Sequence, residues 1–347
     1  MSFTPISEVG EFGLIARIER TLGPAAEGAR LTTGIGDDAA VLDLGGDRAQ
    51  VVTTDLLVEG VHFDRTFAPL RALGWKAVAV NVSDVCAMNA TPQFVTVSLG
   101  LPNNVSVEGV EAFYVGVREA CERYGVAVVG GDIAASARMT VALTAIGEAP
   151  AGRIVTRGGA EPGDLLCVTG DVGSAAAGLR ILLQGKAAME AGDGGDGAPG
   201  EAPPLSAFAY AVERQLQPQA RLDRVAAWAE AGFRPTSLID ISDGVASEVH
   251  HLCRQSATGA VVEAGLLPIH VQTALAAQQT DGRPEALALY GGEDYELLFT
   301  APEPALSALA PDSFAVVGQM VEPDEGIALR LGDGETVPLD AEGFRHF

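Results

Sequence analysis

Several apolar stretches of this chain run directly into an aspartate. Residues 51–54 are followed by Asp55, and residues 126–131 are followed by Asp132. Residues 238–239 lead into Asp240, with Asp243 shortly after it. Such runs predict buried strands, and strand ends in α/β folds are where ligands commonly bind. One such aspartate could cap a helix, but the repetition favours a fold that gathers carboxylates at the ends of buried strands.

Two further acidic positions fit the same pattern. The turn Gly34-Ile35-Gly36-Asp37-Asp38 holds a pair of carboxylates, and Asp84 lies within an otherwise apolar predicted helix. An unpaired buried carboxylate is costly, and only two lysines are available as partners. Divalent cations are the natural compensation, and carboxylates with Thr and Ser hydroxyls form hard oxygen sites that suit Mg²⁺. Several magnesium ions with few lysines indicate phosphoryl transfer.

The overall charge excludes some classes of protein. The net charge of −24 is opposite to the basic surface that nucleic-acid binding requires, so no nucleic-acid partner is expected. Apolar residues make up 48% of the chain, but no run of eighteen of them occurs, so no membrane span is expected. The first residues do not resemble a secretory signal, and we expect a cytoplasmic protein. The four cysteines form no Cys-x-x-Cys pair and are expected to be reduced thiols.

Several familiar active-site motifs are missing from the sequence. It contains no P-loop, no kinase-type glycine loop with a His-Arg-Asp partner, and no Gly-x-Ser-x-Gly elbow. His250 and His251 follow Glu248 but form no His-Glu-x-x-His motif, so we interpret them as ordinary helix residues. Any phosphate site must therefore use arginine, backbone N–H groups or metal ions.

The order of apolar patterns predicts a two-domain α/β protein of the α+β type. The boundary is expected near Pro150, which gives domains of residues 1–149 and 150–347. Residues 185–204 are rich in Gly, Ala, Glu and Pro and are interpreted as a flexible insertion. The predicted helices are 10–22, 69–88, 107–124, a helix from 173, 219–231 and 245–255, and the predicted strands are 39–44, 50–54, 94–101, 126–129, 139–148, 163–170, 237–241, 295–300 and 314–319.

These motifs together resemble the thiamine-monophosphate kinase family of the aminoimidazole-ribonucleotide-synthetase-like ATP-binding superfamily, almost from end to end. The Gly-Asp-Asp and Ser-Asp motifs mark the superfamily. The combination specific to the kinase is His62, the block Gly291-Gly292-Glu293-Asp294-Tyr295-Glu296-Leu297 and the ending Gly343-Phe344-Arg345-His346-Phe347. The resemblance implies transfer of the ATP γ-phosphoryl group to thiamine monophosphate, giving thiamine diphosphate. It also implies a homodimer whose N-terminal sheets pair into a barrel, with ATP bound near the interface.

The resemblance also implies a role for individual residues. The N-terminal domain would bind ATP and magnesium and form the dimer, and the C-terminal domain would complete the substrate site. Asp37 is either a ligand or a residue that holds its turn, and Ile133 stands where the family often has Thr. Arg157 would neutralise phosphate charge, without a side chain acting as base. The implied magnesium ligands are Asp38, Thr53, Thr54, Asp55, Asp84, Asp132, Asp240 and Asp243; the ATP contacts are Tyr114, Gly131, Arg157 and Ser242; the substrate contacts are His62, Glu293 and Phe344.

Other functions stay open at this point. Within the superfamily, an aminoimidazole-ribonucleotide-synthetase-like enzyme is the main alternative. Selenophosphate synthetase would need a reactive Cys or selenocysteine with a Lys near the N-terminus, and the hydrogenase-maturation enzyme would end in Cys. The first Cys here is Cys86, the first Lys is Lys76, and the chain ends in Phe347. A non-catalytic acidic metal-binding protein would bind Mg²⁺ or Ca²⁺ without turning over ATP.

Overall fold

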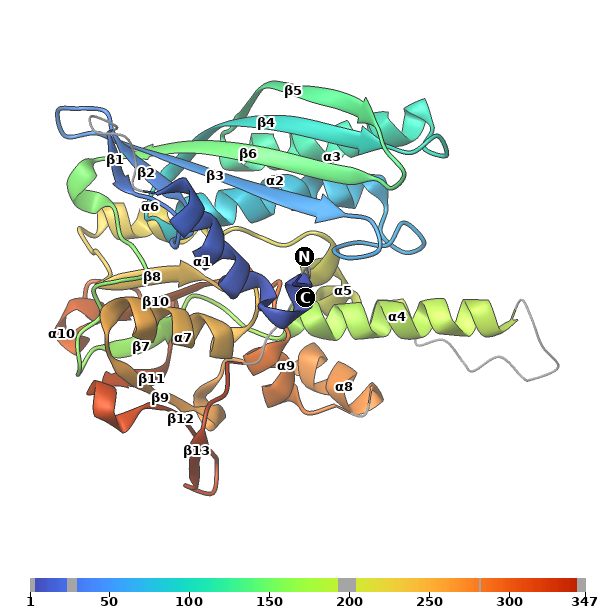
Figure 1. Ribbon diagram of the computed structural model, residues 1–347. Helices are drawn as coiled ribbons and strands as arrows, with labels where there is room; N and C mark the ends of the chain where they lie inside the picture. The colour runs from blue at the N-terminus through green and yellow to red at the C-terminus, as the bar shows by residue number, and fades with distance from the viewer. Residues whose placement is uncertain (1–3, 24–29, 193–203, 281, 342–347) are drawn as a thin grey trace.

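Two β-sheets lie one above the other, with helices packed against both (Figure 1). The computed structural model describes residues 4–23, 30–192, 204–280 and 282–341. The first sheet has the order β1-β2-β3-β6-β4-β5 and the second the order β13-β12-β9-β11-β7-β10-β8. The strands of the first sheet are β1 (Leu31–Thr33), β2 (Ala40–Asp43), β3 (Ala49–Val58), β4 (Thr91–Leu101), β5 (Ala127–Ala135) and β6 (Thr140–Ala149). The strands of the second are β7 (Leu165–Val168), β8 (Ser237–Asp240), β9 (Gly259–Glu263), β10 (Leu297–Ala301), β11 (Ala315–Val321), β12 (Ile327–Arg330) and β13 (Thr336–Pro338).

The helices include one that is buried on nearly every side. Helix α2 (Leu70–Ala87) packs against α3 (Val107–Tyr124) and against the first sheet, and it also contacts β8 of the second sheet. A helix that is apolar all round belongs in a protein interior. The remaining helices are α1 (Gly10–Leu22), α4 (Ser174–Gly192), α5 (Ala209–Leu216), α6 (Leu222–Glu230), α7 (Val245–Ser256), α8 (Val271–Gln279), α9 (Pro284–Tyr290) and α10 (Glu303–Leu306).

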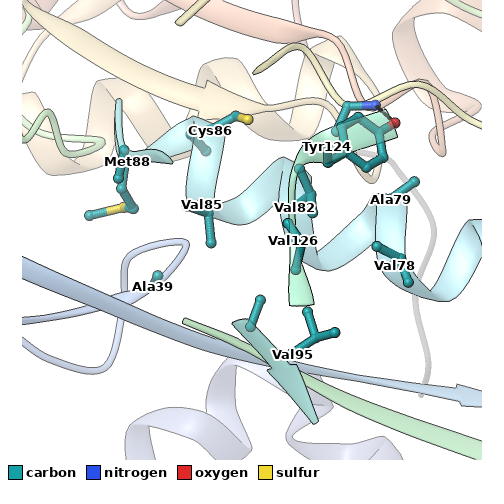
Figure 2. Close-up of a cluster of buried hydrophobic side chains, with 14 of the residues drawn as sticks. Ala39, Val78, Ala79, Val82, Val85, Cys86, Met88, Val95, Tyr124 and Val126 are labelled. Carbon is teal, nitrogen blue, oxygen red and sulfur yellow. Dashed lines mark hydrogen bonds between the residues drawn. The ribbon is translucent and has the colours of Figure 1, made fainter. Parts of the chain in front are cut away.

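One hydrophobic core crosses the predicted domain boundary. Figure 2 shows part of it, where Val82 and Val85 of α2 lie near Val95 of β4. The same cluster continues into the second half through Trp228 and Phe299. Each sheet is built from one side of residue 150, but the two sheets share this core. The division into domains at that point therefore stays a prediction.

Two predicted strand ends are wrong. Strand β3 does not end at Asp55 but continues to Val58, because the alternation of buried and exposed side chains persists through that residue. Strand β5 does not stop at Gly130; it runs through Asp132 to Ala135, and all its residues are exposed rather than buried. Both aspartates therefore lie inside strands. A strand can be apolar without being buried when it lies at the edge of a sheet.

The predicted flexible insertion is partly helical. Residues 185–192 continue α4, which projects from the body of the molecule (Figure 1). The following residues, 193–203, lie outside the described part of the chain, as does Phe344. Among the described residues, no helix is long and apolar enough to cross a membrane. The cytoplasmic location expected from the sequence stays a prediction.

Candidate active site

Three carboxylates from distant parts of the chain meet between the two sheets. One oxygen each of Asp38, Asp84 and Asp240 lies within 4.8 Å of the others. Asp38 lies in the loop before β2, Asp84 on α2 and Asp240 at the end of β8. The first two come from the half that forms the first sheet, and the third comes from the second sheet. The three form a group of oxygen donors of the kind that holds Mg²⁺.

Hydroxyl and amide side chains hold these carboxylates and their neighbours. Thr53 Oγ1 donates to Asp84 Oδ2 at 2.6 Å and also lies 3.2 Å from the carbonyl oxygen of Asp38. Ser83 Oγ donates to Asp240 Oδ2 at 2.5 Å. The backbone N–H of Asp55 donates to Asn81 Oδ1 at 3.2 Å, which ties the middle of β3 to helix α2. Asn81 and Ser83 of α2 therefore face the acidic cluster.

Burial and mutual repulsion disfavour negative charge in this cluster. Burial, followed by the charges of Asp55, Asp240 and Asp38, raises the pKa of Asp84 well above its ordinary value. Burial and the charge of Asp38 raise the pKa of Asp240 to about 8. Burial raises the pKa of Asp55 to about 6. A cation bound among these carboxylates would reverse this balance, because it stabilises their ionised forms.

Asp38 has one oxygen occupied and one free to bind. Arg157 Nη2 donates to Asp38 Oδ1 at 2.5 Å, and the Asp38 side chain is only 2% exposed. Within the ranges that the structure describes, Asp38 Oδ2 is buried and has no hydrogen-bond partner. Buried carboxylate oxygens are normally satisfied. An unpaired oxygen beside two further carboxylates fits a bound divalent cation.

Asp37 is held by backbone groups. The N–H of Asp38 donates to Asp37 Oδ1 at 3.0 Å, and the N–H of Arg157 lies 3.3 Å from Asp37 Oδ2. Burial first, and then the neighbouring charge of Asp38, raises the pKa of Asp37 to about 6. These contacts favour the interpretation that Asp37 stabilises the turn and that Asp38 is the ligand.

Two of the expected ligands lie on the other face of the first sheet. Leu56, Ala142, Ser98 and Asp132 occupy one cross-strand row, and cross-strand neighbours share a face. Successive residues of a strand alternate between faces, so Thr54 lies on the face of Leu56, and Thr53 and Asp55 lie on the face that meets α2. Three strand spacings also separate β3 from β5, or roughly 14 Å. A single chain therefore does not bring Thr54 and Asp132 to the carboxylate trio.

Two of the expected ATP contacts lie near the exposed edge of the first sheet. Gly131 is on β5, in register with Val97 of β4. Tyr114 of α3 and Val128 of β5 line the same surface pocket, which has a volume of about 480 Å³. Arg157, by contrast, is at the trio. The expected ATP contacts thus fall into two groups within one chain.

The loop between α9 and β10 places Glu293 beside helix α2. Lys76 Nζ lies 2.6 Å from Glu293 Oε1, and Gln215 Nε2 donates to Glu293 Oε2 at 2.6 Å. The N–H of Glu293 donates to the carbonyl oxygen of Ser242 at 2.7 Å. This loop therefore packs directly against the turn that follows β8.

Asp243 and His62 both lie in turns that follow strands. The N–H of Asp243 donates to buried Glu248 at 2.8 Å, which places Asp243 at the start of α7. His62 lies in the turn after β3, where its Nδ1 accepts from the N–H of Val58 at 3.0 Å. Phe344 lies outside the described residues, so its contact stays a prediction.

Three polar side chains of α2 besides Asp84 were not predicted as site residues. Lys76, Asn81 and Ser83 are 4%, 1% and 0% exposed, and each contacts an acidic residue of the site or its backbone. The sequence held a signal for them, because a polar residue at a buried position of an apolar helix needs a hydrogen-bonding or charged partner.

Comparison with known proteins gives a consistent result. Residues 36–149 match the family model of the AIR synthase related protein, N-terminal domain. The thiamine-monophosphate kinase of Aquifex aeolicus is 36% identical over 346 residues, which cover 99% of each chain. That of Escherichia coli strain K12 is 36% identical over 97% of this chain and 98% of the relative.

Solved structures agree with the sequence relatives. The structure of AaThiL complexed with AMPPCP and TMP has a TM-score of 0.83 and 34% identity, and the match covers all of both chains. The hydrogenase maturation protein HypE in complex with ATP, at 21% identity and a TM-score of 0.65 over 87% of each chain, shares the fold alone. The chain belongs to the thiamine-monophosphate kinase family.

Proposed function

We propose that this chain transfers the γ-phosphoryl group of ATP to the phosphate of thiamine monophosphate and so forms thiamine diphosphate. The observation that carries the proposal is the trio of Asp38, Asp84 and Asp240, with one oxygen of Asp38 buried and unpaired in the described structure. Such a site supplies the charge neutralisation that phosphoryl transfer requires. The full-length similarity to thiamine-monophosphate kinases supports the choice of substrate.

The chemistry needs little from a general base. A phosphate oxygen of thiamine monophosphate forms a bond to the γ-phosphorus as the bond from that phosphorus to the β-phosphate oxygen breaks, and ADP leaves. The attacking phosphate is largely ionised at neutral pH because its second pKa is about 6. No proton has to be removed from it. The site would therefore act by holding the two phosphates in line and stabilising their charge.

Four residues are the main proposed magnesium ligands. Asp38, Asp84 and Asp240 offer carboxylate oxygens, and Thr53 adds a hydroxyl that already contacts Asp84. Magnesium bound there would neutralise charge on the ATP oxygens. Asp55 and Asp243 lie on the neighbouring strand and turn, and we propose them as further ligands.

Other residues of the same region would bind the phosphates and the acceptor. The guanidinium of Arg157 is ion-paired with Asp38, so it would bring positive charge to the phosphates from the edge of the metal site. Ser242 follows Asp240 closely and would contact ATP. His62, Glu293 and Phe344 would contact thiamine monophosphate.

We propose a homodimer that completes the ATP site. Thr54, Gly131, Asp132 and Tyr114 lie away from the trio in one chain, although the resemblance assigns them to the same ligands. Strand β5 is exposed along its whole length, and its apolar residues Val129 and Ile133 are 57% and 61% exposed. Long exposed apolar edges are typical of strands that pair with another chain. Pairing of two first sheets into a barrel would bring each β5 edge to the partner chain, with residues 1–149 as the dimerising domain.

Release of ADP tests the proposed function. The purified chain would be incubated with ATP and Mg²⁺ and with thiamine monophosphate, free thiamine or an aminoimidazole-ribonucleotide precursor. We expect ADP release only with thiamine monophosphate and only with Mg²⁺ present. Release with the precursor instead would indicate the other branch of the superfamily. Binding of Mg²⁺ without ADP release on any acceptor would indicate a non-catalytic protein.

A further inference from the structure

The ammonium group of Lys76 lies in the protein interior, where a charged group is unfavourable unless it has a partner. Lys76 is 4% exposed, and its Nζ contacts Glu293 Oε1 at 2.6 Å and the carbonyl oxygen of Gln215 at 3.4 Å. Lysines are almost never fully buried unless they are paired. The chain has only two lysines, and the other, Lys186, lies on α4 with a side chain that is 30% exposed. A buried pair of this kind is weak evidence for stability, because desolvation opposes the Coulombic attraction.

Glu293, the partner of Lys76, has a backbone conformation that is unusual for a residue other than glycine. Glu293 and Tyr295 have φ values of 60° and 53°, in the left-handed region that residues other than glycine rarely adopt. A Cβ on Gly292 would lie 2.4 Å from the carbonyl oxygen of Ser242, so this loop is pressed against the turn after β8. Backbone strain of this kind persists only where the surroundings hold it, and it clusters at ligand sites.

The carboxylate of Glu293 is held from two sides and remains accessible. Lys76 contacts one of its oxygens and Gln215 the other, and the Glu293 side chain is 24% exposed. The backbone N–H of Glu293 also donates to the carbonyl oxygen of Ser242, two residues beyond Asp240. Burial, and then the charges of Glu293, Asp55 and Asp240, raise the pKa of Tyr295 well above its ordinary value. The Tyr295 hydroxyl therefore lies within the electrostatic influence of Glu293 and of two proposed metal ligands, Asp55 and Asp240.

We propose that Lys76 and Gln215 are positioning residues that fix the Glu293 carboxylate for contact with the phosphate acceptor. This inference rests on the proposed function, in which Glu293 contacts thiamine monophosphate. Without the two donors, the partly exposed carboxylate would turn toward solvent. The acceptor would then bind more weakly, while ATP, held at the trio and at Arg157, would bind as before.

The test compares Michaelis constants for the two substrates in Lys76→Met, Lys76→Arg and Gln215→Met. We expect Lys76→Met to raise KM for thiamine monophosphate by about tenfold, as loss of a supporting partner commonly does, and to leave KM for ATP unchanged. Lys76→Arg should recover part of the loss because the charge is restored. Gln215→Met should also raise KM for thiamine monophosphate. This variant keeps the ion pair between Lys76 and Glu293, so it tests the inference even if Lys76→Met does not fold. Arg330→Met, which breaks the exposed pair with Glu263 on the second sheet, serves as the control and should change neither constant.

A double-mutant comparison separates positioning from simple destabilisation. If Lys76 acts through Glu293, Lys76→Met combined with Glu293→Gln should raise KM for thiamine monophosphate no further than Glu293→Gln alone. Three outcomes would overturn the inference. KM could rise equally for both substrates, or the effects of the two substitutions on KM could be additive. KM for thiamine monophosphate could also stay unchanged in folded Lys76→Met and Gln215→Met. Failure of the wild-type chain to phosphorylate thiamine monophosphate would instead overturn the proposed function, so the two failures are distinguishable.

Discussion

Ser83 and Asp240 join the two halves of the chain at the acidic site. The hydroxyl of Ser83 on α2 donates to Asp240 Oδ2 at 2.5 Å, and both residues are buried. Helix α2 thereby orients a carboxylate at the end of β8, while the next residue on the helix, Asp84, supplies a carboxylate of its own. The two sheets must therefore be correctly packed before the trio exists.

Loss of this orienting hydroxyl should weaken magnesium binding. Ser83→Ala removes the donor to Asp240, and loss of a partner that orients a ligand typically costs about 10-fold or more in metal affinity. We expect the Mg²⁺ concentration for half-maximal activity to rise by about that factor. The measurement is a magnesium titration of ADP release. Ser313→Ala, which removes an exposed hydroxyl contact with Ala310, is the control and should leave the titration unchanged.

The stability of the metal-free protein should depend on pH through Asp55 and Asp240. A carboxyl whose pKa is raised on folding keeps its proton in the folded state, so its contribution is fully present below the unfolded pKa of 3.8 and is lost as pH rises through the folded value. That value is about 6 for Asp55 and about 8 for Asp240. Bound Mg²⁺ displaces those protons. The rise in Tm produced by saturating Mg²⁺ should therefore grow between about pH 5.5 and pH 8.

Asp84→Asn provides the control for this pH dependence. It replaces a buried carboxyl, whose ionisation burial disfavours, with a neutral amide. The metal-free Tm should therefore rise where the carboxyl is ionised in the unfolded chain, and the shift produced by Mg²⁺ should shrink at every pH. A magnesium shift of the same size at about pH 5.5 and pH 8 in the wild-type chain would contradict the proposed ligand set.

The adjacent glycines of β5 should respond very differently to a methyl group. A Cβ on Gly131 would lie 1.8 Å from the carbonyl oxygen of Val97, whereas a Cβ on Gly130 would meet no atom within 4 Å in the described structure. Gly131→Ala should force β5 away from β4 at a cost of about 1–3 kcal/mol, and it should lower Tm by several degrees. Gly130→Ala should leave Tm nearly unchanged. Thermal denaturation of the two variants is the measurement, and equal Tm values would show that the β4–β5 pairing is not as close as described.

A charge on the exposed edge should prevent dimer formation. Ile133 on β5 is 61% exposed, and a lysine on an edge strand opposes pairing with another chain. We expect Ile133→Lys to be monomeric by light scattering and to lose activity together with the dimer. Leu266→Lys alters an exposed apolar residue of the second half and should stay dimeric. A wild-type chain that is monomeric yet fully active would exclude the shared site.

The sequence predicted the acidic trio better than it predicted its surroundings. Asp38, Asp84 and Asp240 were among several acids predicted from a glycine turn, an apolar helix and strand ends, and the structure brings these three together. Their role as metal ligands stays a prediction. The side of the sheet on which Thr54 and Asp132 lie could not be predicted, because a shift of one residue in register moves a side chain to the other face. The contact between Lys76 and Glu293 depends on how the two halves pack.

Strand ends were the weakest part of the fold prediction for a related reason. The bounds of α3 agree with the predicted helix 107–124, where the apolar periodicity and Gly125 mark both the face and the end. Gly130 and Gly131 were interpreted as the end of a strand, but β5 continues through them as an exposed edge. Composition alone does not distinguish a glycine that ends a strand from one that permits close approach of a neighbouring strand.

Transfer of a labelled γ-phosphoryl group shows directly whether the chain phosphorylates thiamine monophosphate. The chain would be incubated with ATP labelled at the γ-phosphorus, thiamine monophosphate and Mg²⁺, and the products would be separated by chromatography. We expect label in thiamine diphosphate, none with EDTA, and at least about 100-fold less with Asp38→Asn, the scale of loss when one electrostatic group is removed from a preorganised site. Label released only as inorganic phosphate, or transfer that persists without Mg²⁺ or with Asp38→Asn at the wild-type rate, would contradict it.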